Sequence, residues 1–293
     1  SSIMLGDATT GTIDAANYNT GVGVDVFEDL TSGDNNAAFG FFALGNNTSG
    51  GNNTMVGAYA GALNIDDADN TAVGYAANYP DGGSRVTAVG SQALNANTAN
   101  DNTAVGFAAM TATTTGHSNT AMGKRALQTN TTGIQNTSLG ASSMSANTEG
   151  ATNTAVGENA LASNTTASSN TAVGSAALTT NTTGTANVAF GSLSADANTT
   201  GSYNTAIGYG TLTANTTGHD NTAVGINSLA ANTTAHYNTA VGSSALEGCT
   251  TGEYNTAVGQ LAMDAASMTG NFNSALGRAA LGANTTGSSN CAV

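Results

Sequence analysis

Charged residues are scarce in this chain, and almost all of them have the same sign. Only 8% of the 293 residues are charged, and 18 acidic residues against four basic ones give a net charge of −14. Binding to a nucleic-acid backbone requires several Lys or Arg side chains on one face. The basic residues are Arg85, Lys124, Arg125 and Arg278. Such a composition excludes nucleic acid as a class of partner.

Large side chains and long apolar runs are also lacking. The chain has no Trp, one Pro and 5% aromatic residues. So few large side chains cannot fill a thick globular core, but they can fill a thin one in which two backbones lie close together. No apolar run approaches the length that crosses a bilayer, and no leader pattern is visible. We therefore expect no membrane insertion within this segment.

Two cysteines are too few for a disulfide framework. Cys249 and Cys291 also stand at different places in the repeat described next, two to three copies apart. Their Cα atoms should therefore lie too far apart for a bond, so we expect two free thiols.

What the chain has instead is a repeat of 17 residues. Its clearest copy runs from Asn204 to Asp220 and reads NTAIGYGTLTANTTGHD. Repetition at a short fixed period is typical of stacked solenoid units, and a regular apolar residue in each unit argues against disorder. The spacing shortens by one residue on either side of Val86 and lengthens by one before Asn273. Other copies begin at Ser2, Asn19, Asn36, Asn53, Asn70, Asn102, Asn119, Asn136, Asn153, Asn170, Asn187, Asn221, Asn238 and Asn255.

Each repeat is numbered here from its first Asn, so that Asn204 is position 1. Seventeen residues are too few for two helices and a turn, and Gly with Thr-Thr disfavours helix. We predict two β-segments, at positions 1 to 5 and 7 to 11, with a Gly at position 5 that permits close backbone approach. The Asn-Thr-Thr-Gly sequence at positions 12 to 15 predicts the return turn, with φ above zero at the Gly.

The fold class predicted is therefore all-β, a parallel β-solenoid (β-roll) of about 17 rungs, in which equivalent Asn, Thr, Val and Leu residues form ladders. We expect degenerate capping repeats over residues 1–35 and one continuous run of regular repeats over 36–293. Positions 4, 5 and 9 are assigned structural roles, with Val and Leu in the core. These residues include Val105, Gly106, Leu127, Val156, Gly157, Val173, Gly174, Ile207, Gly208, Leu212, Val224, Gly225, Val241 and Gly242.

Position 3 is small and never charged, as at Ala104, Ala155 and Ala206. If the residue at position 4 faces the interior, position 3 faces outward, since neighbours in a strand alternate. A long uncharged strip on the outside is typical of an interface. This pattern predicts a symmetric bundle of identical chains around that strip.

The core Asn-Thr-Ala-Val-Gly-x-x-Ala-Leu resembles the head repeats of trimeric autotransporter adhesins. The longer unit that ends in Asn-Thr-Thr-Gly is similar to shaft repeats of phage tail fibres and related bacterial fibre proteins. The resemblance covers nearly the whole chain. It implies a left-handed β-roll in a homotrimer, found on a virion, on a cell surface or outside the cell, that reaches toward a host receptor or glycan.

Candidate binding groups are few. Tyr203, Tyr237 and Tyr254 share position 17 with Phe272 and could contact glycans, although such a stripe more often covers a core edge. His117, His219 and His236 share position 16, and His219 and His236, one rung apart, are expected to stack at strand spacing. Exposed turn residues are favoured there over a metal site. Asp66, Asp67 and Asp69 match no strong calcium motif and are favoured as a solvated loop. Several Asn-Thr-Thr triplets match the glycosylation pattern, among them those that begin at Asn164, Asn181, Asn198, Asn215, Asn232 and Asn284.

No nucleophile arrangement or phosphate loop is visible, so we expect neither an enzyme nor a bound cofactor or metal. The function favoured is a structural fibre or adhesin shaft. One alternative is a surface-binding solenoid of the ice-binding kind, although the Thr residues of positions 13 and 14 stand in a turn. Another is a filament subunit that stacks end to end. Because the chain begins and ends inside a repeat, we expect either a segment of a longer protein or a unit that stacks.

Overall fold

The computed structural model describes residues 3–5, 15–79 and 82–293. The chain divides into two compact units, Ser1–Glu149 and Gly150–Val293, and each is described by itself. Both are all-β, and the described residues contain no helix. Ser2, where the first copy of the repeat begins, lies outside the described residues.

Each repeat contributes one short β-strand. In the first unit these are β1 Ile3–Leu5, β2 Thr20–Val22, β3 Ala37–Phe39, β4 Thr54–Val56, β5 Thr71–Val73, β6 Thr87–Val89, β7 Thr103–Val105, β8 Thr120–Met122 and β9 Thr137–Leu139. In the second unit they are β10 Thr154–Val156, β11 Thr171–Val173, β12 Val188–Phe190, β13 Thr205–Ile207, β14 Thr222–Val224, β15 Thr239–Val241, β16 Thr256–Val258, β17 Ser274–Leu276 and β18 Cys291–Ala292.

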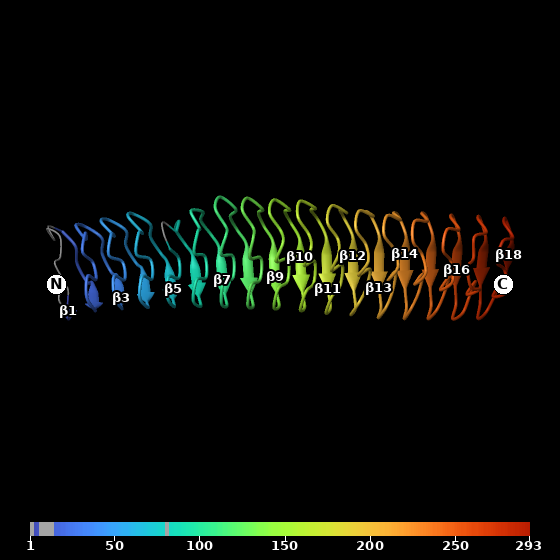
Figure 1. The fold of residues 1–293 in the computed structure, drawn as a ribbon, viewed down its shortest axis with the longest axis horizontal. Helices are drawn as coiled ribbons and strands as arrows, with labels where there is room; N and C mark the ends of the chain where they lie inside the picture. The colour runs from blue at the N-terminus through green and yellow to red at the C-terminus, as the bar shows by residue number, and fades with distance from the viewer. Residues whose placement is uncertain (1–2, 6–14, 80–81) are drawn as a thin grey trace. The chain divides into compact units, whose positions relative to one another are not determined.

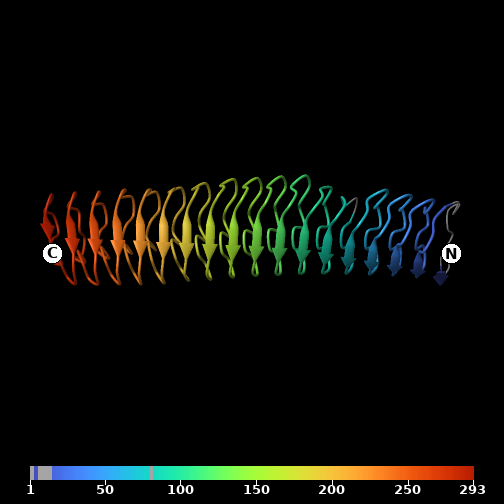
Figure 2. The same cartoon turned by 180° about the vertical axis from the view of Figure 1, so that it is seen from behind.

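Within each unit every strand pairs in parallel with the next one along the chain (Figure 1). Equivalent residues are partners, so Thr205 pairs with Thr222 and Ala206 with Ala223. The register steps of 16 residues around Val86 and of 18 before Asn273 leave these pairs intact, because Thr71 pairs with Thr87 and Thr256 with Ser274. The same sequential stacking is visible from the other side (Figure 2). The parallel β-solenoid and its ladders are thus confirmed.

The predicted second β-segment is wrong. Positions 7 to 11 form a turn, in which positions 7 and 9 have a left-handed backbone, as at Asn227 (φ 55°) and Leu229 (φ 52°). Position 9 nevertheless points inward as predicted, and Leu127 and Leu212 are 0% exposed. A left-handed backbone costs a non-Gly residue roughly 1–2 kcal/mol, which burial of a Leu side chain offsets.

The predicted faces of the strand are reversed. Position 3 is inside, since Ala104, Ala155 and Ala206 are 0% exposed, whereas position 4 points outward. Val105, Val156, Val173 and Val224 are half-buried, and Ile207 and Val241 are exposed. The roll is so thin that a Leu or Met from position 9 fills most of its interior. A small Ala fits opposite that side chain, and a branched Val has no room there.

Gly at position 5 is required by the stacking of the turns. Its φ lies between +126° and +142° in the described copies, a region that side chains rarely adopt. A Cβ on Gly106 or Gly225 would also meet the backbone of the next turn. The Gly of the return turn, at position 15, behaves differently, because φ above zero occurs two residues later, at position 17. That part of the turn prediction is wrong.

Two ladders of buried Asn side chains cross the interior. At position 1, the Oδ1 atom of Asn187 accepts a hydrogen bond from the backbone N–H of Asn204 (2.9 Å), and its Nδ2 donates to the Gly201 carbonyl (2.8 Å). At position 12, the Nδ2 of Asn198 donates to the same carbonyl (2.9 Å) and to Asn181 Oδ1 (2.8 Å). Carboxamides that both donate and accept thus satisfy the interior from one turn to the next.

The same burial bears on the glycosylation pattern. Asn164, Asn181, Asn215 and Asn232 are 0% exposed and Asn198 is 1% exposed, each as a member of the position 12 ladder. An amide in that place is not accessible to a modifying enzyme once the turn has folded.

Thr113 and Cys249 interrupt the position 12 ladder. Both are 0% exposed, and the Thr113 hydroxyl has no hydrogen-bond partner among the described residues. Cys249 lacks the amide that its neighbour Asn232 requires, and in the described part of the chain Asn232 Oδ1 is left without a hydrogen-bond partner. Burial raises the pKa of the Cys249 thiol to about 11. Both cysteines are free thiols, as predicted.

Replacing Thr113 with Asn is expected to raise the free energy of unfolding by about 1 kcal/mol. The new amide can donate to the Gly116 carbonyl, as Asn130 does to Gly133 (2.9 Å), and accept from Asn130. The measurement is the urea midpoint of the full chain. Thr113→Val is the control, because it removes the unpaired hydroxyl without joining the ladder. A Thr113→Asn midpoint at or below that of Thr113→Val would contradict the ladder's contribution.

Candidate functional site

The outward face of the strands forms a uniform surface in each unit. It consists of positions 2 and 4, mostly Thr and Val, and we call it the Thr–Val strip. The strip contains none of the charged residues of the chain. Val22, Val56, Val73 and Val241 are between 36% and 38% exposed. A β-strand face without charge that leaves branched apolar groups open to water is typical of an interaction surface.

Position 4 of the strip varies in size. Its most exposed members in the described copies are Phe39 (40%), Met122 (47%), Phe190 (56%) and Leu276 (54%), apart from the first and last strands. Position 4 is therefore apolar in every copy, but its side chain varies in size and shape. This strip was not predicted, because position 4 was assigned to the core. The available signal was a compensation of size between positions 3 and 9, since Gly21 accompanies Phe27 and Met55 accompanies Gly61, as expected of two positions that share one interior.

The position 17 stripe lies on the outside of the second unit. Tyr237 stacks on Tyr254 with ring centroids 4.9 Å apart, and Tyr254 stacks on Phe272 at 5.0 Å. These side chains are 46% to 59% exposed, so they do not cover a core edge. Because the ring faces contact one another, they offer mainly edges to a sugar. Tyr203 has 62% exposure and stands apart from that stack, with Asp220 between it and Tyr237 in the ladder.

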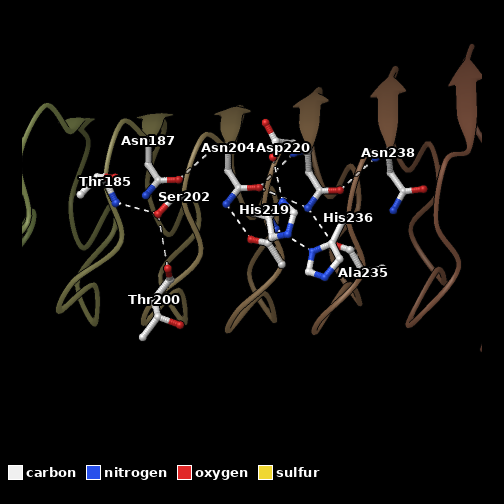
Figure 3. A network of polar contacts seen from close by, with 12 residues as sticks. Thr185, Asn187, Thr200, Ser202, Asn204, His219, Asp220, Ala235, His236 and Asn238 are labelled. Carbon is white, nitrogen blue, oxygen red and sulfur yellow. Dashed lines mark hydrogen bonds and ion pairs between the residues drawn. The ribbon is translucent and has the colours of Figure 1, made fainter.

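The His pair of position 16 contacts this stripe, because the ring centroids of His219 and Tyr237 are 5.4 Å apart. Figure 3 shows the two imidazoles and Asp220 within the surrounding polar network. The imidazoles of His219 and His236 stack with centroids 3.7 Å apart. The Nδ1 of His236 accepts the backbone N–H of His219 (3.1 Å), and His219 Nδ1 contacts Asp220 Oδ2 (2.8 Å). The pKa of His236 is lowered, first by burial and second by repulsion from His219, while Glu253 and Asp220 oppose the shift. Stacking at strand spacing is as predicted.

This lowered pKa makes part of the stability depend on pH. The unfolded chain binds a proton at His236 more readily than the folded chain does. The stabilising contribution is therefore complete above an ordinary histidine pKa of about 6.5, and is lost as the pH falls through the lower folded value. We expect the urea midpoint to fall less between about pH 7.5 and about pH 5 in His236→Asn than in the parent chain. Position 16 already accepts Asn at Asn271.

His117→Asn serves as the control for that comparison. His117 shares position 16 in the first unit, where its Nδ1 contacts the Ser118 hydroxyl (3.1 Å) and no second imidazole is stacked on it among the described residues. An equal loss of stability on acidification in the parent chain and in His236→Asn would show that the stacked pair does not contribute.

The acidic cluster is held by neighbouring turns. Asp67 Oδ1 accepts the Ser84 hydroxyl (3.0 Å), and Asp69 Oδ1 accepts the Asn52 amide (3.0 Å). Over residues 3–5, 15–79 and 82–293, no group of three or more His, Cys, Asp or Glu is placed to hold a metal ion. Nor does that part of the chain contain a helix long and apolar enough to cross a membrane.

Comparison with known proteins adds no family. No protein-family model, no curated protein and no solved structure matches this chain. The geometry of the described residues therefore carries the functional argument.

Proposed function

We propose that this chain forms the shaft of an extracellular or virion-borne fibre or adhesin, in which identical chains associate, as a homotrimer, through their Thr–Val strips. The shaft projects a surface-binding element toward a host receptor or glycan. The proposal retains the association inferred from sequence but moves its surface from position 3 to positions 2 and 4.

The observation that carries this proposal is the polarity of the strip. Positions 2 and 4 hold none of the chain's 22 charged residues, although other outward positions such as 6, 16 and 17 hold Glu158, Glu253 and Asp220. A solvated face has no need to exclude charge in every copy. Parallel strands that are covered on both sides have near-continuous apolar sequences, and Thr-Ala-Val comes close to such a sequence.

Substitution of one outward Val tests this interface. Val224→Glu places a charge on the strip in each copy, and burying an unpaired charge costs about 3 kcal/mol or more, which is about a hundredfold in an association constant. We expect the parent chain to have three times its 28.5 kDa mass by light scattering and Val224→Glu to dissociate. Ile226→Glu is the control, because Ile226 is 55% exposed in the same turn but outside the strip. A parent chain that is monomeric would refute the proposal.

An ice-binding role is the second candidate, and one observation favours it. Position 2 places a ladder of Thr side chains on the face of regular parallel strands, with Thr205, Thr222 and Thr239 in register. From the sequence, only the Thr residues of the return turn had been considered for this role. Ordering of water on a repeating surface requires uniform neighbours, and Phe39, Phe190 and Leu276 interrupt that uniformity. Clear thermal hysteresis from a monomeric sample would favour this second role over the shaft.

A further inference from the structure

The first unit contains a surface hollow at a place where the sequence departs from the regular repeat. It has a volume of about 480 Å³ and is lined by Tyr59, Tyr75, Ala76, Tyr79, Gln92 and Asn95. We call it the tyrosine hollow. Small-molecule sites in proteins begin at roughly 300 Å³ and combine aromatic walls with a few polar groups. The hollow is therefore large enough for one or two sugar rings.

The aromatic rings of the hollow do not stack face to face on one another. Tyr59 and Tyr75 meet edge to face, with ring centroids 6.1 Å apart and planes at 86°. Phe41 supports Tyr59 in the same way, at 5.2 Å and 83°. In the position 17 stripe, by contrast, the rings of Tyr237 and Tyr254 cover each other's faces. The electron-rich face of an aromatic ring attracts polarised C–H groups, such as those on one side of a pyranose.

Its polar groups are neutral and can both donate and accept. Asn95 uses its Nδ2 on the Ala76 carbonyl (3.2 Å), which fixes the amide and leaves its oxygen as an acceptor. Gln92 adds a second carboxamide, and the tyrosines add phenol groups. None of the lining residues is charged at neutral pH. An anionic ligand would find no cation in this hollow and a chain of net charge −14 around it.

The turns that form the hollow are hydrogen-bonded in register, and the irregularity lies in the residues that line it. Backbone bonds from Gln92 N to Tyr75 O (2.9 Å) and from Ala76 N to Ala58 O (3.0 Å) hold the adjacent turns in register. The repeat that begins at Asn70 is one residue shorter than the standard repeat and has Asn78 where most copies have Leu or Met. Local departure from a regular pattern, against an intact ladder, is expected where a surface has been adapted for binding.

We propose that the tyrosine hollow binds a neutral pyranose of a glycan, with Tyr75 stacking on the sugar ring and Gln92 and Asn95 bonding to its hydroxyls. The proposal deepens the host-surface role of the proposed fibre, because it names the ligand class and moves the contact from Tyr203, Tyr237 and Tyr254 to the first unit.

Titration of the full chain with defined sugars tests the site. The panel is maltose, cellobiose, lactose and diacetylchitobiose, with 3′-sialyllactose as the anionic comparison. Binding is followed by calorimetry and by tyrosine fluorescence, which is readable because the chain has no Trp. We expect at least one neutral disaccharide to bind with a Kd of about 1 mM or lower, and sialyllactose to bind at least about tenfold more weakly than lactose if lactose is a ligand.

Two substitutions locate the binding. Tyr75→Ala is expected to weaken it at least about tenfold, and Gln92→Ala by about threefold to tenfold. Tyr209→Ala is the matched control, because Tyr209 also occupies position 6, with 56% exposure against 54% for Tyr75, and lies outside the hollow. Tyr209→Ala should leave the Kd within about twofold of the parent value. Circular dichroism verifies that each variant retains the fold.

Three results would overturn the proposal. The first is that no neutral sugar of the panel binds at concentrations up to about 20 mM. The second is that Tyr75→Ala and Tyr209→Ala weaken sugar binding equally. The third is that the hollow binds a proline-rich peptide and no sugar. Light scattering on the same samples reports the oligomeric state separately. A trimer that binds no sugar would refute the hollow alone, and a monomer that binds sugar would refute the shaft alone.

Discussion

Gly208→Ala is expected to lower the free energy of unfolding by about 3 kcal/mol or more. The φ of Gly208 is +137°, in a region that is essentially restricted to Gly. A Cβ would also lie 2.6 Å from the Gly225 carbonyl oxygen of the next turn. That carbonyl cannot withdraw without breaking the stacking of β13 on β14. The urea midpoint of the full chain measures the effect.

Gly201→Ala is the matched control for that result. Gly201 occupies position 15, where a Cβ would also approach the next turn, but its backbone lies outside the left-handed region. The chain itself carries Ala167 and Ala235 at this position, both buried. A small shift therefore suffices, and we expect a loss of less than about 1 kcal/mol. Equal losses in the two variants would show that φ at position 5 does not decide stability.

Asn187→Ala is expected to lower the free energy of unfolding by about 3 kcal/mol. The substitution removes two hydrogen bonds and leaves the buried backbone N–H of Asn204 without its acceptor. The Gly201 carbonyl keeps its bond from Asn198 (2.9 Å), so the unpaired N–H is the main consequence. An unsatisfied backbone donor in a dry interior costs more than a hydrogen bond that is simply absent.

Asn198→Ala separates the two ladders. Asn198 is equally buried and bonds to the same Gly201 carbonyl, but its oxygen accepts from a side chain, Asn215 Nδ2 (2.8 Å), that also bonds to Gly218 (3.0 Å). Asn198→Ala leaves no backbone group of the described residues without its only partner. We therefore expect the free energy of unfolding to fall by about 1 kcal/mol less than in Asn187→Ala. Denaturation of both variants in the same buffer makes the comparison. A larger loss for Asn198→Ala would contradict the role assigned to the position 1 ladder.

The repeat made most of the fold predictable. Period, strand location, parallel stacking and the ladders of Asn and Leu follow from residues that recur in phase, such as Asn204, Gly208 and Leu212. The two faces of the strand were not predictable, because Thr-Ala-Val alternates in the same way whichever residue points inward. The turn at positions 7 to 11 was also missed, since Leu229 in a left-handed backbone is unfavourable locally and is stabilised only by burial in the roll.

The candidate sites show the same division. The stacking of His219 on His236 followed from their spacing of one repeat. The tyrosine hollow could not be predicted from spacing, because Tyr59, Tyr75 and Tyr79 occupy three different positions of the 17-residue repeat. Only the path of the turn shows that they line one hollow with Gln92 and Asn95.

By itself, therefore, the sequence determined that this is a parallel β-solenoid and which residues stack on which. Tertiary structure alone decided which side of the strand is interior and which surfaces remain for partners. The physical reason is the thickness of the roll. One large side chain per turn fills it, so Leu212 and its equivalents enter, Ala206 lies opposite them, and Thr205 and Ile207 are left outside.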